Sequence, residues 1–244
     1  HSRVVSHNSR HVEQGVSSNT MARKVATIRS FYKYLTKANK IDDNPLVDLD
    51  SPKTRKSLPR YLTLDEAKGL LSSVTGRNKE RDYCILTLFL NCGMRLSELC
   101  GINISDIRDD NSLRILGKGN KERLIPIGSQ AIKYLKIYLN EIRNTQKINS
   151  ESEDYVFLNR RGNPLSRVMI FIIIKDLSLK IGLNKTISPH TFRHSFASHL
   201  VEGGADLRAV QDMLGHESIT TTEIYTHVDK DYLQSIITQY HPRS

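Results

Sequence analysis

The chain has 244 residues, a formal net charge of +10 and a sequence pI near 9.5, which favours a polyanionic partner such as nucleic acid. Charge alone leaves an ordinary basic protein equally open. The longest apolar run, 168–174, is too short to span a bilayer, and no signal peptide is recognisable. Three cysteines without a CxxC pair argue against a disulfide framework; they are Cys84, Cys92 and Cys100. We therefore expect a soluble, cytoplasmic protein without a membrane partner, whose natural N-terminus precedes His1.

Residues 1–18 are polar and show little periodicity, whereas apolar residues between Met21 and Leu35 recur at helical spacing. Basic residues occupy most of the remaining surface of this segment, which predicts a basic amphipathic helix. Its basic face is either simply solvated or lies against DNA phosphates. The candidates for such contacts are Arg23, Lys24 and Arg29.

The stretch 51–60 is basic, contains prolines near both ends and has almost no apolar residues, so it is expected to be an interdomain linker. It separates a first segment, 1–50, from a second domain, 61–244. A positively charged linker could also cross a DNA backbone. Its candidate contacts are Lys53, Arg55 and Lys56.

Local signals predict a second domain that is mainly α with a small antiparallel β-sheet. Thr63 is a helix cap, and a helix over 79–91 should be closed by Gly93. Turn residues separate three extended pieces that form a small meander, at 101–107, 112–116 and 121–127. Five further helices are expected near 129–144, 166–181, 190–202, 206–214 and 230–239.

The second domain also contains a set of side chains that suits phosphoryl transfer. They are Arg95, Lys118, His190, Arg193, His216 and Tyr225. Arginine and histidine donors can bind the charge on a phosphodiester in flight, and tyrosine can form a covalent intermediate. Lysine and histidine can move the protons of the nucleophile and the leaving oxygen. Each residue alone has an ordinary structural explanation, but together they supply a complete reaction.

Motifs for other chemistries are missing from the sequence. No Glu follows His190, so the pair His190 and His194 is not the HExxH motif of metalloproteases. The run Gly117-Lys118-Gly119 lacks the frame of a nucleotide-binding P-loop, and no clustered carboxylates suggest a two-metal nuclease. The sequence therefore favours phosphoryl transfer without a metal, a nucleotide or another cofactor.

Three segments resemble the tyrosine recombinases, most closely the bacterial Xer-type enzymes that resolve chromosome dimers. NCGMRLSEL at 91–99 resembles the family's first-arginine motif, and GKGNKERLIPIG at 117–128 resembles its β-hairpin lysine motif. Residues 188–228 resemble the rest of the active site, and His241-Pro242-Arg243 resembles the Xer C-terminus. The resemblance implies a tyrosine-recombinase catalytic domain preceded by the remnant of a helical core-binding (SAM-like) domain, normally a bundle of about four helices.

The resemblance also implies a role for each member of the set. Arg95, Arg193 and His216 would bind the scissile phosphate, and Lys118 would protonate the 5′-oxygen that leaves. His190 would assist or orient Tyr225, the nucleophile that becomes a 3′-phosphotyrosine. Lys121 and Arg123, in the same hairpin as Lys118, are further candidates for DNA contacts.

Family members recombine two double-stranded DNA sites as a tetramer, through a Holliday junction. The resemblance therefore implies homo- or heterotetramers and, in some systems, a DNA translocase that activates the complex. The apolar residues of the C-terminal helix, Leu233, Ile236 and Ile237, either pack on their own domain or dock into a neighbouring protomer. We favour the second arrangement when DNA is present.

Three alternative functions are compatible with many of the same sequence features. A mobile-element integrase shares the chemistry and differs in its biological substrate. A type IB topoisomerase uses a similar residue set as a monomer, although the Xer-like tail and compact motif spacing argue against it. A binding module that has lost catalysis is disfavoured because all six residues are present.

Overall fold

A computed structural model of the chain describes residues 16–50, 52, 61–117, 122–215 and 227–242, and within 227–232 and at Gln234 only the helical backbone. The chain divides into two compact units, 1–58 and 59–244. Of the expected linker, 51–60, the structure describes only Pro52.

The first unit contains the basic amphipathic helix that the sequence predicts. Helix α2 (Ser18–Lys37) starts where Ser17 caps the backbone N–H of Thr20. Val25 is buried against Leu46 and Leu49, which follow the helix. The opposite surface is exposed and includes the basic residues Arg23 and Lys24 as well as the apolar residues Ile28, Phe31 and Tyr34.

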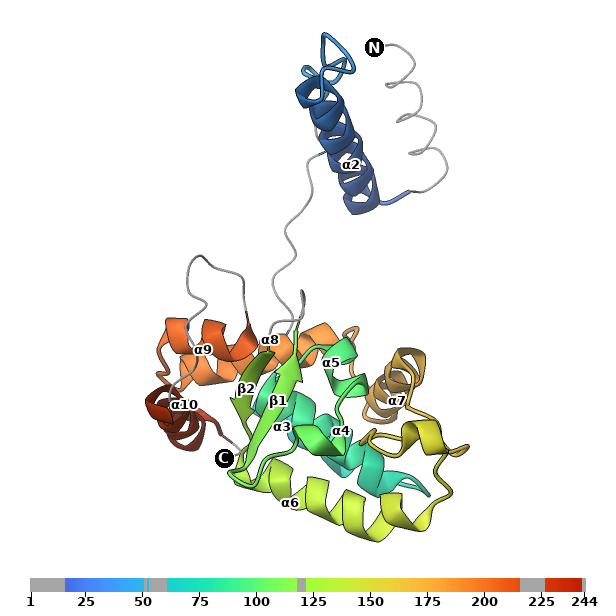
Figure 1. Cartoon of the computed structure of the whole chain (residues 1–244), viewed down its shortest axis with the longest axis vertical. Helices are drawn as coiled ribbons and strands as arrows, with labels where there is room; N and C mark the ends of the chain where they lie inside the picture. The colour runs from blue at the N-terminus through green and yellow to red at the C-terminus, as the bar shows by residue number, and fades with distance from the viewer. Residues whose placement is uncertain (1–15, 51, 53–60, 118–121, 216–226, 243–244) are drawn as a thin grey trace. The chain divides into compact units, whose positions relative to one another are not determined.

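Helix α4 (Lys79–Cys92) forms the centre of the second unit (Figure 1). Ten of its fourteen residues are buried, and it packs between α6 (Ser129–Ile137) and α8 (Pro189–Glu202). It ends at Gly93, which has the left-handed φ of 56°. A Cβ at Gly93 would lie 2.4 Å from the Phe196 ring, so both the backbone and the packing require glycine there.

The predicted capping of the first helix of this unit is confirmed. Helix α3 (Leu64–Ser72) begins with a capping box in which the Thr63 hydroxyl accepts from the Glu66 N–H and the Glu66 carboxylate accepts from the Thr63 N–H.

All three cysteines are free thiols, in agreement with the expectation that they form no disulfide framework. Cys84 and Cys92 are fully buried in α4, and burial raises the pKa of both thiols.

The small sheet has two strands. Strand β1 (Ser112–Leu116) pairs antiparallel with β2 (Glu122–Pro126), with Leu113 opposite Ile125 and Ile115 opposite Arg123. The prediction of a third extended piece at 101–107 is wrong. This segment contains the short 3-10 helix Ile104–Asp106 and has isolated β-bridges in place of a strand.

Side-chain hydrogen bonds, one local and two from a distant residue, explain why 101–107 is not a strand. The Asp106 carboxylate accepts from the backbone N–H of Asn103, and the Asp154 carboxylate accepts from both the N–H and the hydroxyl of Ser105. Such bonds satisfy backbone N–H groups that a sheet ladder would otherwise use.

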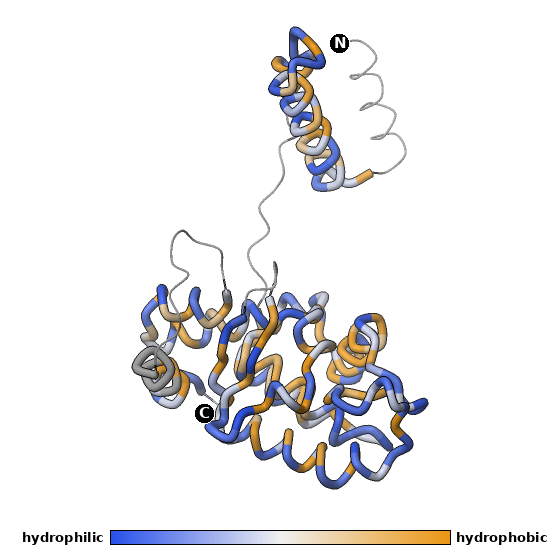
Figure 2. Tube along the Cα trace, viewed as in Figure 1, coloured by the Kyte–Doolittle hydropathy of each residue, from blue (hydrophilic) through white to orange (hydrophobic). Residues whose placement is uncertain are grey.

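The five further helices that the sequence predicts lie close to their expected positions, and one short helix, α5 (Leu96–Cys100), was not predicted. Helix α5 follows α4, and α6 continues through a π-helical turn, Tyr138–Ile142, and a 3-10 turn, Arg143–Thr145. After the 3-10 turn Ser150–Ser152 come α7 (Arg167–Lys180), α8, α9 (Leu207–Leu214) and α10 (His227–Tyr240). Figure 2 shows that α7 is largely apolar. Some of its apolar side chains are exposed, among them Val168 and Leu179. No helix in the described part of the chain is long and apolar enough to cross a membrane.

The C-terminal helix packs on its own domain in this structure. Leu233, Ile236 and Ile237 of α10 are buried in a second apolar cluster with residues of α8 and α9, among them Phe196 and Met213. His241, just after α10, is also buried and its Nε2 lies 3.0 Å from the carbonyl oxygen of Leu90.

Candidate active site

Arg95 lies between α4 and α5, immediately after the turn at Gly93. Its backbone N–H and its Nη1 donate to the two carboxylate oxygens of Glu98, at 2.7 and 2.8 Å. Its Nη2 donates to the carbonyl of Gly215, at the end of α9, at 3.1 Å. The side chain is about one third exposed. Arg95 is therefore oriented by protein contacts on one side and accessible to an anion on the other.

Arg193 reaches the same place from α8. Its Nη1 donates to the Gly93 carbonyl at 2.8 Å and its Nη2 to the Leu214 carbonyl at 2.5 Å. Burial lowers the pKa of Arg193 to about 10, and the charges of Arg95 and Arg123 act in the same direction. His190 is exposed one turn earlier on α8, so its spacing of three residues places it on the same side of the helix.

Glu98 is a site residue that the sequence reading missed. It accepts from Arg95 and also from Arg123, whose Nη1 and Nη2 lie 2.9 and 2.8 Å from its two oxygens. Burial acts to raise the pKa of Glu98, but the hydrogen bonds from Arg123 and Arg95 hold it at about 2. The one sequence signal for this role was the spacing of three residues between Arg95 and Glu98.

Arg123 is placed differently from the expectation of a DNA contact. Only 7% of it is exposed, and besides Glu98 it donates from Nε to the Met213 carbonyl at 3.2 Å. All three nitrogens of its guanidinium group donate to protein oxygens inside the domain, which argues for a structural role in place of a phosphate contact.

The three arginines meet at the C-terminal end of α9. Arg123, Arg193 and Arg95 donate to three successive carbonyls there, those of residues 213, 214 and 215. The last carbonyls of a helix lack helical partners and carry partial negative charge, so cations stabilise them. Three guanidinium groups nevertheless face a single carboxylate, so the cluster has excess positive charge that suits a phosphate.

The other members of the expected set lie outside the described residues. Lys118 falls in 118–121, between β1 and β2 in the chain, and His216 and Tyr225 fall in 216–226, which follows Gly215 directly. Lys121, a candidate for DNA contacts, falls in 118–121 as well.

The candidates for DNA contacts in the first unit differ from one another. Arg23 and Lys24 are exposed on α2. Arg29 is half-buried, and its Nη2 donates to the carbonyl of Leu49. Lys53, Arg55 and Lys56 lie outside the described residues.

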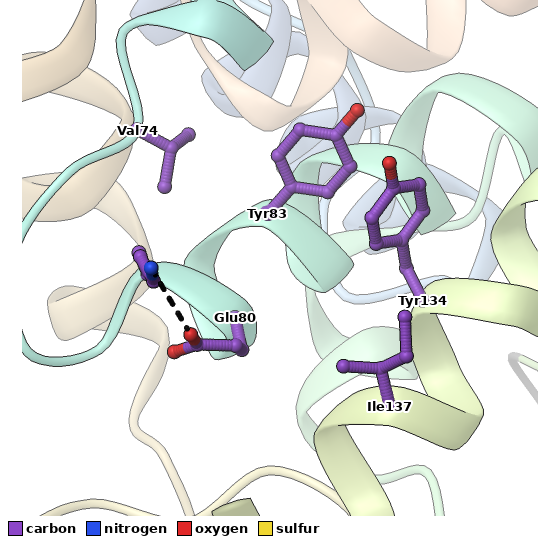
Figure 3. A pocket seen from close by; sticks show the side chains of 6 residues that line it. Val74, Glu80, Tyr83, Tyr134 and Ile137 are labelled. Atoms are coloured by element: carbon purple, nitrogen blue, oxygen red, sulfur yellow. Dashed lines mark ion pairs between the residues drawn. The ribbon is translucent and has the colours of Figure 1, made fainter. Parts of the chain in front are cut away.

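A pocket of about 220 Å³ lies at the opposite end of α4 (Figure 3). The rings of Tyr83 and Tyr134 face it with centroids 4.2 Å apart, and the pair Lys79 and Glu80 borders it. It contains none of the expected catalytic residues. Within the described residues no group of three or more His, Cys, Asp or Glu side chains could hold a metal.

Comparison with known proteins agrees with the fold and with the sequence motifs. The model of the phage integrase family matches residues 60–231. Tyrosine recombinase XerD of Halalkalibacterium halodurans is 45% identical over 235 residues, which cover 95% of this chain and 78% of that protein. The crystal structure of XerA recombinase is 30% identical with a TM-score of 0.61, over 99% of this chain and 84% of that one.

A structure of XerH site-specific recombinase bound to its palindromic difH substrate is 26% identical with a TM-score of 0.70, over 91% of this chain and 67% of that one. The chain belongs to the phage integrase family and is a tyrosine recombinase, an enzyme of site-specific DNA recombination.

Proposed function

We propose that the enzyme cuts DNA by attack of the Tyr225 hydroxyl on a scissile phosphate that Arg95 and Arg193 bind. The observation that carries this proposal is the convergence of both guanidinium groups on the end of α9. The two carbonyls that they contact, those of Gly215 and Leu214, precede Tyr225 by ten and eleven residues in the chain. Bidentate guanidinium groups suit the non-bridging oxygens of a phosphodiester whose negative charge grows during attack.

The remaining residues supply proton transfer and a further donor. Tyr225 loses its phenolic proton as it attacks, with His190 as the base or orienting group, and His216 donates to the phosphate. The 5′-oxygen leaves and takes a proton from Lys118. The resulting 3′-phosphotyrosine keeps the energy of the broken bond, so a 5′-hydroxyl from a partner duplex can rejoin the strand without a nucleotide cofactor.

Attachment of the enzyme to DNA involves both units in this proposal. The exposed Arg23 and Lys24 on α2 support a phosphate contact by the first segment, 1–50, which we interpret as the end of a helical DNA-binding domain. Lys53, Arg55 and Lys56 of the linker and Lys121 of the hairpin add positive charge. The catalytic domain, 61–244, supplies the chemistry.

The biological reaction we propose is resolution of chromosome or plasmid dimers through a Holliday junction. The identity of 45% to a protein named XerD supports it. Integrases with 23% identity share the fold alone, so mobile-element integration is the second candidate. The type IB topoisomerase reaction would appear as relaxation of supercoiled DNA that contains no recombination site.

Assembly into a tetramer would use α10. Its apolar residues now pack on α8 and α9 of the same chain, so docking into a neighbouring protomer requires that this helix leave its own domain. A DNA translocase that acts on this helix is the proposed activator. Sedimentation with and without a DNA site, on the wild type and on Ile236→Glu, would measure whether assembly depends on α10.

The decisive experiment uses a nicked suicide substrate, in which cleavage traps the covalent complex. We expect a slow-migrating protein–DNA band on a denaturing gel with the wild type and none with Tyr225→Phe, although both bind DNA. Lys118→Ala should cleave slowly and recover with a 5′-bridging sulfur, because that leaving group needs no acid. A band that persists in Tyr225→Phe would contradict the assignment of the nucleophile.

A further inference from the structure

Arg123 is a buried arginine that bonds to two segments beside the proposed active site. It lies in β2, directly after Glu122. Through Glu98 it is connected to Arg95, and through the Met213 carbonyl it is connected to the helix end that precedes His216.

We propose that Arg123 is a positioning residue that holds three described segments in one arrangement: strand β2, the segment of Arg95 and Glu98, and the end of α9. It does this from inside the protein and does not itself bind DNA. The inference rests on the proposed function, because it concerns how the phosphate-binding arginines are held for that reaction.

The geometry requires a guanidinium group. Nη1 and Nη2 bind the two oxygens of one carboxylate while Nε binds a carbonyl of another segment, so three donors in one plane connect two separate bodies. A lysine at 123 offers one compact charge and cannot occupy both positions. Gly215 packs against the same group: a Cβ there would lie 3.1 to 3.3 Å from Cδ, Nε and Cζ of Arg123.

Arg123 also sets the charge available at Arg95. Glu98 accepts from Arg95 and Arg123 together, so its single negative charge is shared between two cations. Without Arg123, the buried carboxylate would be compensated by Arg95 alone, which would hold that guanidinium more tightly and reduce the positive potential offered to phosphate. The loss would thus affect both the position and the charge of the cluster.

The chain offers a matched control. Arg143 is also a buried arginine, with 2% exposure, and it donates from Nε and Nη2 to the carbonyls of Tyr155 and Glu153, at 2.9 and 2.5 Å. These partners belong to none of the three segments. If the contribution of Arg123 were only that of a buried, hydrogen-bonded arginine, then Arg123→Lys and Arg143→Lys would have similar effects.

The test compares Arg123→Lys, Arg123→Gln and Arg143→Lys in the full chain. Thermal unfolding, DNA affinity by gel shift, and single-turnover cleavage of the suicide substrate are measured for each, with rates taken per DNA-bound molecule at saturating protein. Expressing rates in this way removes any unfolded fraction from the comparison, so a loss of stability does not hide the result.

We expect both Arg123 variants to bind DNA within about threefold of the wild type, since an internal residue makes no phosphate contact. Their cleavage should fall by about 100-fold, because a shift of about 1 Å in a catalytic group costs this much. Arg143→Lys should cleave within about threefold of the wild type at a comparable loss of thermal stability.

Two results would overturn the inference. One is cleavage by Arg123→Lys within about threefold of the wild type, and the other is a loss of DNA affinity as large as the loss of cleavage, which would make Arg123 a DNA contact after all. Failure of the proposed function looks different, because then the wild type itself forms no covalent band that depends on Tyr225.

Discussion

The two ends of helix α4 have opposite surroundings: one is charged and the other is mostly apolar. At its C-terminal end, Gly93 and Arg95 lead into a cluster of three guanidinium groups and one buried carboxylate. At its N-terminal end, Tyr83 contributes to a hollow with mostly apolar walls, whose charged pair, Lys79 and Glu80, lies at the rim. The hollow is a pocket that contains none of the expected catalytic residues, whereas the charged cluster contains two of them, Arg95 and Arg193.

The difference follows from the substrate. A DNA backbone is a large polyanion, so it is bound by cations that the protein interior orients and the surface exposes, and it does not need to enter a cavity. A concave apolar pocket suits small ligands instead. Four predictions test whether function and stability divide between the two ends in this way.

The largest effect should come from the charged end. Arg193→Ala removes one of the two guanidinium groups that we propose bind the scissile phosphate, and loss of one preorganised donor costs about 10³-fold in rate. We expect single-turnover cleavage to fall by this factor while DNA affinity changes little, because in a protein with a net charge of +10 one cation contributes a small part of the attraction to DNA. A loss of affinity in proportion to the rate would instead mean that Arg193 acts in binding alone.

Glu98→Gln should show what the buried carboxylate contributes to stability. Its pKa is lowered from 4.5 to about 2, so its ionised form stabilises the fold above about pH 4.5, and this contribution is lost as the pH falls towards 2. Breaking such a buried ion pair costs about 3 kcal/mol. Urea unfolding should therefore find the variant less stable at pH 7, with a difference that shrinks at pH 3.

A stability difference between the wild type and Glu98→Gln that is independent of pH would contradict the role of the charge.

Several charged groups surround Glu98. They are Arg95 and Arg193 from the elements beside it, Arg123 from β2, and, across a second hollow that β1 borders, Asp106, Arg114 and Glu122. Because all of these remain in both proteins, their own titration cancels in the comparison.

Gly93→Ala should destabilise the end of α4 by about 2 kcal/mol, because the new methyl group meets the Phe196 and Leu214 side chains and the backbone is left-handed. Gly76→Ala is the matched control: Gly76 has a φ of 93° but no atom within 4 Å of the added Cβ, so it measures the backbone strain alone. Equal losses of stability in the two variants would mean that the packing at Gly93 does not matter.

The smallest effect is expected at the apolar end. Lys79→Ala removes an exposed ion pair with Glu80, which contributes at most about 0.5 kcal/mol. Stability by urea unfolding, DNA affinity and cleavage should all stay close to the wild type. A cleavage defect in this variant would show that the pocket takes part in the reaction and would remove the contrast between the two ends.

The sequence by itself determined most of the local structure. The cap at Thr63, the left-handed turn at Gly93 and the helices up to α10 follow from signals a few residues apart, which is the range over which capping and helical periodicity act. The motifs also placed the chain in its family, and they marked Arg95 and Arg193, which the structure brings together at one helix end.

Only the tertiary structure decided which charged groups face inward. The partners of Arg123 are 25 and 90 residues away in the chain, so a basic residue beside a basic turn resembled a DNA contact until the fold brought Glu98 and Met213 to it. The segment 101–107 had the composition of a strand but bonds to Asp154, 49 residues later. The apolar side of α10 could pack on its own domain or on a neighbour, and we favoured the neighbour when DNA is present. In this structure of a single chain it is buried against α8 and α9 of its own domain, because packing depends on surfaces that distant segments create together.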